Sequence, residues 1–188
     1  MKFILSLLTA FSFCLYNLAS AQTTVGDVTL KNNYKFGDYN LVLNGGGIRK
    51  KLWFEVYVAG LYLKSKSPKA DKIITSDELM AITIDITSSV VSSDKMISAT
   101  QEGFEKSLDG STQKLQDKID QFIAVFNEEI SVGDNYEIVY YPGEGVKVYK
   151  NKKYKSIITG LEFKQALFGI WLSDDPVDSK LKSNMLGI

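Results

Sequence analysis

The spacing of apolar side chains along the chain changes between a period of two and a helical period. Residues 79–90 (LMAITIDITSSV) place methionine or isoleucine at every even position from 80 to 86, with smaller or polar side chains between them. This alternation predicts a strand with one buried face. Residues 52–63 are instead apolar on both parities and rich in β-branched and aromatic side chains. We therefore expect a long strand that is buried on both faces.

Three segments have the spacing of amphipathic helices. Residues 92–108 begin with a pair of capping serines and repeat apolar side chains along one helical face. Residues 112–129 (TQKLQDKIDQFIAVFNEE) form a second such stripe. The last segment, residues 162–187, predicts two helices. The first ends near Leu172. The second begins at Pro176, with the acidic pair before the proline as its cap, and ends at Gly187.

The remaining segments complete an antiparallel pattern. Strands are predicted at 27–30 and 39–44, an amphipathic turn at 69–75, and a three-stranded meander over 135–158. Blocks of strands alternating with clustered helices predict an α+β fold, in which helices pack on one face of a curved antiparallel sheet. No repeat or proline-rich linker interrupts this order, so residues 22–188 are expected to form a single domain.

Residues 1–21 have the pattern of a signal peptide. Lys2 is followed by an apolar stretch, and Ala19-Ser20-Ala21 has the small side chains of a signal-peptidase site. The alternative is a membrane anchor, but the stretch is short for a span of about 20 residues and lacks a basic flank. We therefore expect export, with cleavage before Gln22 and a periplasmic or secreted location.

Composition limits the chemistry open to the exported chain. The sequence has no histidine, and its single cysteine, Cys14, lies in the expected signal peptide. Histidine-based catalysis, histidine-ligated metals and disulfides are therefore excluded. The full sequence has 22 basic and 22 acidic side chains, and removal of Lys2 with the signal peptide leaves 21 basic side chains. This near-neutral balance gives no general attraction to nucleic acid. We expect no nucleic acid, metal or cofactor, and the sequence identifies no protein partner.

Three motifs resemble the chalcone isomerase family. Residues 43–63 (LNGGGIRKKLWFEVYVAGLYL) are similar to its glycine-rich signature, which ends in arginine and leads into a long strand. Residues 92–108 resemble a family helix, and ALFGIWLSDDPVDSKLKSNMLG resembles the closing helices of exported bacterial members. The resemblance implies an open-faced β-sandwich with a ligand cleft. Family members are isomerases that close a chalcone to a flavanone, fatty-acid-binding proteins, or non-catalytic proteins that assist a pathway enzyme.

Arg49 matches the family's site arginine. The resemblance implies that it stabilises the oxyanion of ring closure in isomerases and grips a carboxylate in fatty-acid binders, and a permanently charged guanidinium suits both roles. Taken alone, Arg49, Lys50 and Lys51 could equally form a solvated basic turn. The glycines before Arg49 are expected to let backbone and ligand approach closely.

Tyr57 lies where isomerases carry a threonine, and a tyrosine paired with the arginine resembles the fatty-acid-binding arrangement. It could also be a core aromatic. Eight residues of extended strand span about 26 Å, so Arg49 and Tyr57 can share a ligand only if the chain reverses near 50–52. By the same resemblance, Ser92, Ala99 and Gly169 replace the tyrosine, asparagine and hydroxyl residue of isomerases.

One main hypothesis and two alternatives follow. The main hypothesis is an exported protein that binds a small amphipathic or aromatic ligand, such as a fatty acid, with Arg49 and Tyr57 as ligand-binding residues. The first alternative is an intramolecular lyase of the chalcone–flavanone isomerase type, with Arg49 as its catalytic residue. The second is an envelope protein whose cleft docks another protein.

Overall fold

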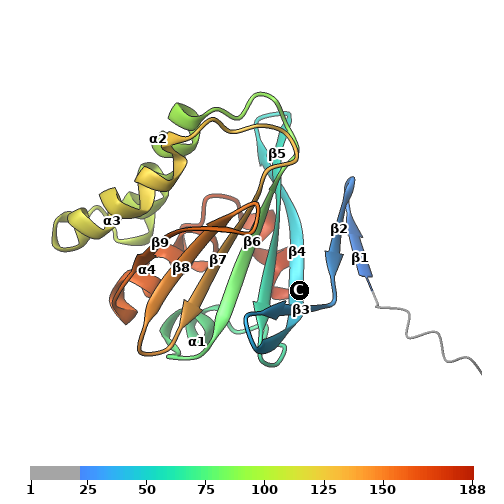
Figure 1. Ribbon diagram of the computed structural model, residues 1–188, viewed down its shortest axis with the longest axis horizontal. Helices are drawn as coiled ribbons and strands as arrows, with labels where there is room; N and C mark the ends of the chain where they lie inside the picture. Colours follow the sequence, from blue (N-terminus) through green and yellow to red (C-terminus); the bar gives the residue numbers. More distant parts are fainter. Residues whose placement is uncertain (1–21) are drawn as a thin grey trace, which may run out of the picture.

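The computed structural model describes residues 22–188, which form one curled antiparallel sheet of seven strands with helices against it (Figure 1). Every strand of this sheet lies beside its neighbours in sequence, in the order β3 to β9. The strands are β3 (Asn33–Phe36), β4 (Tyr39–Lys51), β5 (Phe54–Leu63), β6 (Met80–Ile86), β7 (Asn135–Tyr141), β8 (Gly145–Lys150) and β9 (Lys153–Ile158). The expected signal peptide lies outside the described residues.

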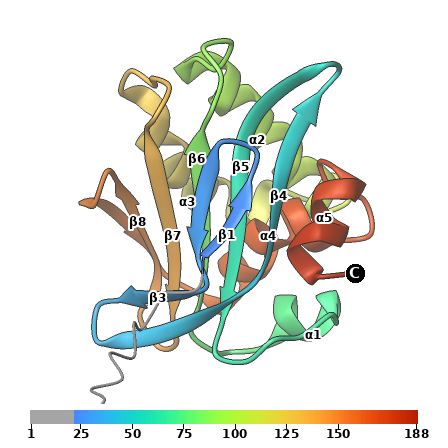
Figure 2. The ribbon, with the colours of Figure 1, turned by 90° about the vertical axis from the view of Figure 1, so that its right-hand side faces the viewer.

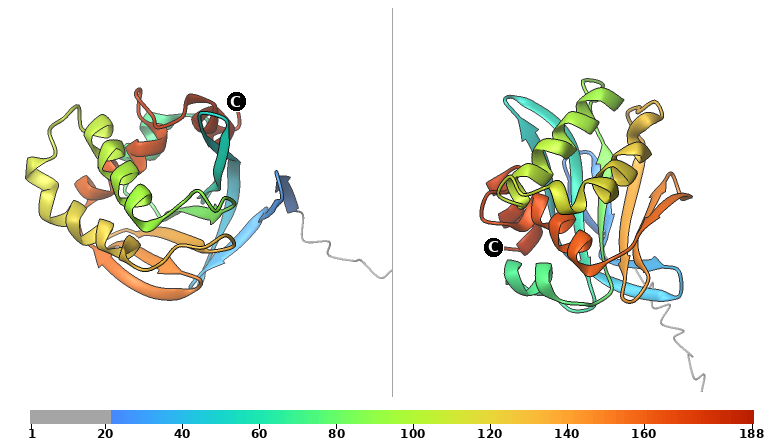
Figure 3. Two further views of the ribbon diagram at one scale, coloured as in Figure 1. Left: turned by 90° about the horizontal axis from the view of Figure 1, so that it is seen from above. Right: turned by 90° about the vertical axis from the view of Figure 1, so that its left-hand side faces the viewer.

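Helices cover the inner face of the curl, as Figure 3 shows from above and from the side. They are α1 (Ala70–Thr75), α2 (Ser93–Ser107), α3 (Gln116–Ile123), α4 (Leu161–Leu172) and α5 (Ser179–Leu186), with the 3-10 turns η1 (Gln113–Leu115) and η2 (Ala124–Asn127) on either side of α3. None of these described helices is long and apolar enough to cross a membrane. The predicted α+β class, with helices on one face of a curved sheet, is confirmed.

Strand β5 is buried on both faces from Tyr57 onward, as its continuous apolar pattern predicts, but the expectation fails at 52–55, where the chain turns and its side chains are exposed. Tyr57 and Leu61 belong to the large core between the sheet and the helices. Val58 and Tyr62 belong to a second core on the outer face, which also contains Leu30. A separate hairpin of β1 (Gln22–Val25) and β2 (Val28–Lys31) lies over that outer face (Figure 2). The expected strand at 27–30 is thus one arm of a hairpin.

The glycine track of β4 is the place where α5 rests on the sheet. A Cβ atom on Gly45 would lie 2.1 Å from the backbone oxygen of Asn184, and one on Gly47 would lie 2.8 Å from the Cβ of Asn184. Gly46 faces the other way, where a Cβ would lie 2.4 Å from Leu30 Cδ1. The expectation that these glycines admit a ligand is therefore wrong, because they admit a helix and a hairpin.

Two predicted helices differ from those in the structure. The last helix begins at Ser179 and not at Pro176, because the side chain of Asp178 accepts hydrogen bonds from the amides of Lys180 and Leu181 and so forms the cap. The acidic pair before Pro176 is exposed. The single helix expected over 112–129 is broken into η1, α3 and η2.

Alanine at the glycine track should displace α5. We expect Gly45→Ala and Gly47→Ala each to lower the free energy of unfolding by about 2–3 kcal/mol, because both overpack the contact with Asn184. Urea denaturation measures this loss. In an Asn184→Gly background, Gly47→Ala should cost less than it does in wild type, because the clashing side chain is gone. Gly45→Ala clashes with backbone and should not recover, so equal rescue of both would contradict the assignment.

Candidate functional site

A cavity of about 630 Å³ lies between the inner face of the sheet and the helices. This volume is within the usual range of small-molecule pockets, roughly 300–1,000 Å³. Strands β5, β6 and β7, helices α2 and α4, and the α3–η2 segment all contribute to its walls. The deep part of the lining is buried and apolar: Ile84, Met96, Phe122, Phe126, Ile138 and Ile170.

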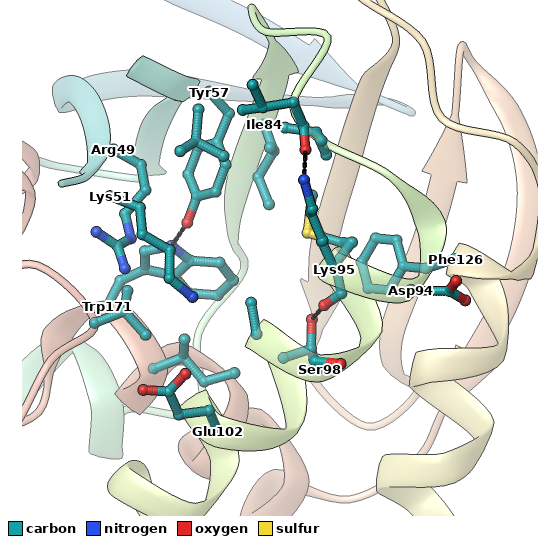
Figure 4. A pocket seen from close by; sticks show the side chains of 18 of the residues that line it. Arg49, Lys51, Tyr57, Ile84, Asp94, Lys95, Ser98, Glu102, Phe126 and Trp171 are labelled. Carbon is teal, nitrogen blue, oxygen red and sulfur yellow. Dashed lines mark hydrogen bonds between the residues drawn. The ribbon is translucent and has the colours of Figure 1, made fainter. Parts of the chain in front are cut away.

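The mouth of the cavity lies between the β4–β5 turn and α2. The exposed lining residues come from these two places: Lys51, Leu52 and Phe54 from the turn and the adjoining strand ends, and Asp94, Lys95, Ser98 and Glu102 from α2. Figure 4 shows Arg49, Lys51 and Tyr57 on one side of the pocket, with Lys95 and Ser98 on the facing side. The polar side chains of the cavity are thus concentrated toward its opening.

Arg49 and Tyr57 are cross-strand partners. The chain reverses at Leu52 and Trp53, and Arg49 on β4 then lies directly opposite Tyr57 on β5. Directly paired residues in an antiparallel sheet project from the same face with their Cβ atoms about 5 Å apart. The condition for the two side chains to share a ligand is therefore met, and both line the cavity.

Arg49 is an inner-wall residue with a fixed ion partner. Its side chain is only 19% exposed, and Nη1 lies 3.4 Å from Oδ2 of Asp178. The same nitrogen donates to the carbonyl of Lys50. Both contacts use Nη1. Arg49 also lies close enough to the Tyr57 hydroxyl to help lower the pKa of Tyr57, but among the described residues no carboxylate or carbonyl accepts from Nε or Nη2. Lys50 and Lys51 are exposed, so the solvated basic turn describes these two lysines but not Arg49.

Asp178 connects the arginine to the start of α5. Its Oδ1 accepts from the amides of Lys180 and Leu181, each at 3.0 Å, and Oδ2 accepts from the amide of Lys50 at 3.1 Å. Burial alone would raise the pKa of this carboxyl, but the three amides and the charge of Arg49 outweigh burial and lower the pKa. Asp178 is therefore ionised at neutral pH and paired with Arg49.

Tyr57 supplies a neutral hydroxyl beside the arginine. Trp171 Nε1 donates to its oxygen at 3.0 Å. Burial raises the pKa of Tyr57, and the opposing effects of Trp171 and Arg49 do not cancel that rise. The phenol thus keeps its proton at neutral pH, and no acceptor for that proton occurs among the described residues. Arg49 and Tyr57 together present unused donors, which is what an oxyanion requires.

Lys51 is a cavity residue that the sequence hypothesis did not include as a ligand-binding candidate. Lys51 follows Arg49 by two positions, and side chains two apart on a strand lie on the same face. This alternation is the sequence signal that identifies Lys51 as a second cavity residue. Of the three positions that correspond to isomerase residues, Ala99 lines the cavity, whereas Ser92 and Gly169 do not. No cluster of three metal-binding side chains occurs in residues 22–188.

A model of the chalcone isomerase-like family matches residues 22–187 of this chain. Among solved structures, the fold is similar to that of a fatty-acid binding protein from Arabidopsis thaliana. The TM-score is 0.66 at 14% sequence identity, over 85% of this chain and 92% of that chain. At this identity the likeness concerns the fold alone. No curated protein matches the chain.

Asp178→Asn should weaken the contact between α5 and β4, and the loss of stability should depend on pH. Asparagine still caps a helix, but its amide cannot pair with Arg49, so we expect a loss of about 1–2 kcal/mol at pH 7. The folded pKa lies below the unfolded value of about 3.9, so the stabilisation is present above that pH and is lost as pH falls through the folded pKa.

Urea denaturation at pH 7 and at pH 3 measures this difference between wild type and Asp178→Asn. The matched control is Asp175→Asn, because Asp175 is 66% exposed and pairs with Lys106 at the surface. Its effect should stay within about 0.5 kcal/mol. A gap between wild type and Asp178→Asn that is unchanged at pH 3 would contradict the role of the ionised carboxylate.

Proposed function

The chain belongs to the chalcone isomerase-like family, as its motifs predicted, and on that premise we propose that it binds a small amphipathic anion, such as a fatty acid. The apolar cavity with hydrogen-bond donors near its mouth carries this proposal. An alkyl chain would fill the space between Ile84, Phe122 and Ile170. Its carboxylate would lie at the opening, where water still solvates part of the charge.

Arg49 is the proposed clamp for the anionic head. Its unused Nε and Nη2 donors can form two parallel hydrogen bonds to a carboxylate, which is the strongest arrangement available to this side chain. The hydroxyl of Tyr57 adds a third donor from the neighbouring strand. Lys51, exposed at the mouth, adds a positive charge that offsets the negative charge of Asp178 behind Arg49.

Chalcone cyclisation has less support. Rate in such a ring closure comes largely from aligning the phenolate and the enone, and isomerases do this with several polar side chains. Here Ala99 contributes only a methyl group to the cavity wall, and the positions of Ser92 and Gly169 lie outside the lining. A fatty-acid binding protein as structural neighbour favours the binding hypothesis, although the sequence similarity is low.

Binding should depend on the charge of Arg49 and on the charge of the ligand. We expect Arg49→Gln to weaken the affinity for a long-chain fatty acid about tenfold or more, because a charge-assisted hydrogen bond contributes roughly 1.5–3 kcal/mol. Displacement of a fluorescent fatty acid measures this. The methyl ester of the same acid lacks the carboxylate and should bind both proteins alike. Lys50→Gln is the matched control, because Lys50 pairs with Glu55 outside the cavity.

Two results would contradict this assignment. Equal affinities of wild type and Arg49→Gln for the fatty acid would remove Arg49 as the clamp. Acceleration of naringenin chalcone ring closure by wild type, lost in Arg49→Gln, would favour the isomerase alternative.

We also propose that the protein is exported and that residues 1–21 are removed. The family match begins at residue 22, where cleavage is expected. Expressed in a bacterial host, the protein should appear in the periplasmic fraction with the intact mass of residues 22–188. Replacing the small side chain in Ala21→Leu should block cleavage and leave the precursor mass. A wild-type precursor that stays uncleaved in the membrane fraction would favour the anchor.

A further inference from the structure

Three consecutive apolar side chains protrude at the turn between β4 and β5. Leu52 and Trp53 are 78% and 79% exposed, and Phe54 is 44% exposed. Leu52 also has a φ of +58°, a conformation that glycine or asparagine adopts at lower cost. Stability of the turn therefore does not explain its apolar sequence, and contiguous exposed apolar side chains are typical of binding surfaces.

A second loop at this end of the sheet carries another exposed apolar side chain. Val132, which is 57% exposed, lies in the loop before β7. The amide of Gly133 in that loop donates to the carbonyl of Ile86 at 2.9 Å, which holds the loop at the end of β6. Figure 1 shows this loop and the β4–β5 turn at the same end of the sheet. Figure 2 shows that the segment between β6 and α2 separates the two, so the apolar tip is defined here as Leu52, Trp53 and Phe54 alone.

Lysines border the apolar tip. Lys50 pairs with Glu55 at 2.9 Å, and the ammonium of Lys95 donates to the carbonyl of Val90 at 2.9 Å. Among the described residues, neither Lys51 nor Lys95 pairs with a carboxylate. At the turn itself, Lys50 and Lys51 stand against Glu55, which leaves an excess of one positive charge. The facing part of α2 exposes Lys95 between Asp94 and Glu102 and adds no positive excess.

The apolar tip is continuous with the mouth of the cavity. Leu52 and Phe54 belong to both, whereas Trp53 belongs to the tip only. A ligand that left the cavity at this point would meet apolar side chains before it met water. If the tip were placed in an apolar medium, Leu52 and Phe54 would form an apolar side of the path between that medium and the cavity.

We propose that the apolar tip docks on the surface of an anionic phospholipid bilayer, so that the ligand passes between the bilayer and the cavity. This inference rests on the proposed function. Tryptophan prefers the headgroup region, where its ring is partly buried and its N–H remains hydrated. Lys51 would lie at the level of the lipid phosphates, which attract a juxtaposed cation. A protruding turn enters a bilayer surface without the complementary groove that a protein partner would need.

Vesicle co-sedimentation tests the docking. Wild type should bind phosphatidylcholine vesicles that contain phosphatidylglycerol, and binding should weaken with salt and without the anionic lipid. Trp53→Ser should lower the partition coefficient roughly tenfold, because it removes the largest apolar side chain of the tip. Tyr39→Ser is the matched control, since Tyr39 is 55% exposed at the opposite end of β4. All variants carry the same N-terminus, so residues 1–21 do not enter the comparison.

Tryptophan fluorescence gives a second readout. Trp53 is exposed and Trp171 is 5% exposed, so a blue shift on adding vesicles reports Trp53. Fatty-acid binding in vesicle-free solution should be the same for wild type and Trp53→Ser, which separates docking from the proposed function. Equal vesicle partitioning of wild type and Trp53→Ser would overturn docking. So would vesicle-independent dimerisation that Trp53→Ser abolishes, because the tip would then bind a second copy of the chain.

Discussion

Helix α5 lies directly on the backbone of β4, and the geometry of the site depends on that contact. Gly45 and Gly47 leave no side chain between strand and helix, so the start of α5 comes within hydrogen-bonding distance of the strand. Asp178 can then accept from the amide of Lys50 and pair with Arg49. Side chains at the two glycine positions would hold the helix away from the strand, and Arg49 would lose its fixed orientation at the cavity wall.

The pairing with Asp178 bears on the proposed role of Arg49 as an anion clamp. An unpaired guanidinium beside an apolar cavity would be costly to desolvate, and a nearby carboxylate reduces that cost. The same carboxylate also reduces the net attraction for an anion. Asp178 already shares its oxygens with backbone amides, whereas Arg49 retains free donors, so directional hydrogen bonds contribute more than net charge here. Tyr57 strengthens this preference because its proton is also free.

The sequence predicts the fold well and the site only in part. Alternation in β6, the continuous apolar pattern of β5 and the capping serine before α2 are local signals, and local signals suffice for elements of that kind. The partner of Arg49 was not predictable, because Asp178 is 129 positions away and becomes adjacent only through the packing of α5. The glycines were misinterpreted for the same reason. A strand glycine indicates close approach, but the sequence does not say whether a ligand or a helix approaches.

Neighbouring elements stabilise one part of the β4–β5 hairpin more than the other. Strand β5 pairs with β6 from Tyr57 onward, opposite Ile86, and the carbonyl of Val56 still accepts from the amide of Thr87. Phe54 and Glu55 extend beyond these contacts as part of a two-stranded ribbon. Two strands without a third are weakly stabilised, and such segments open at lower cost than the sheet interior. The cavity mouth lies at this part of the hairpin, while Arg49 lies where α5 and β5 both hold the strand. Movement of the turn would therefore widen the mouth without disturbing Arg49, the proposed head-group residue.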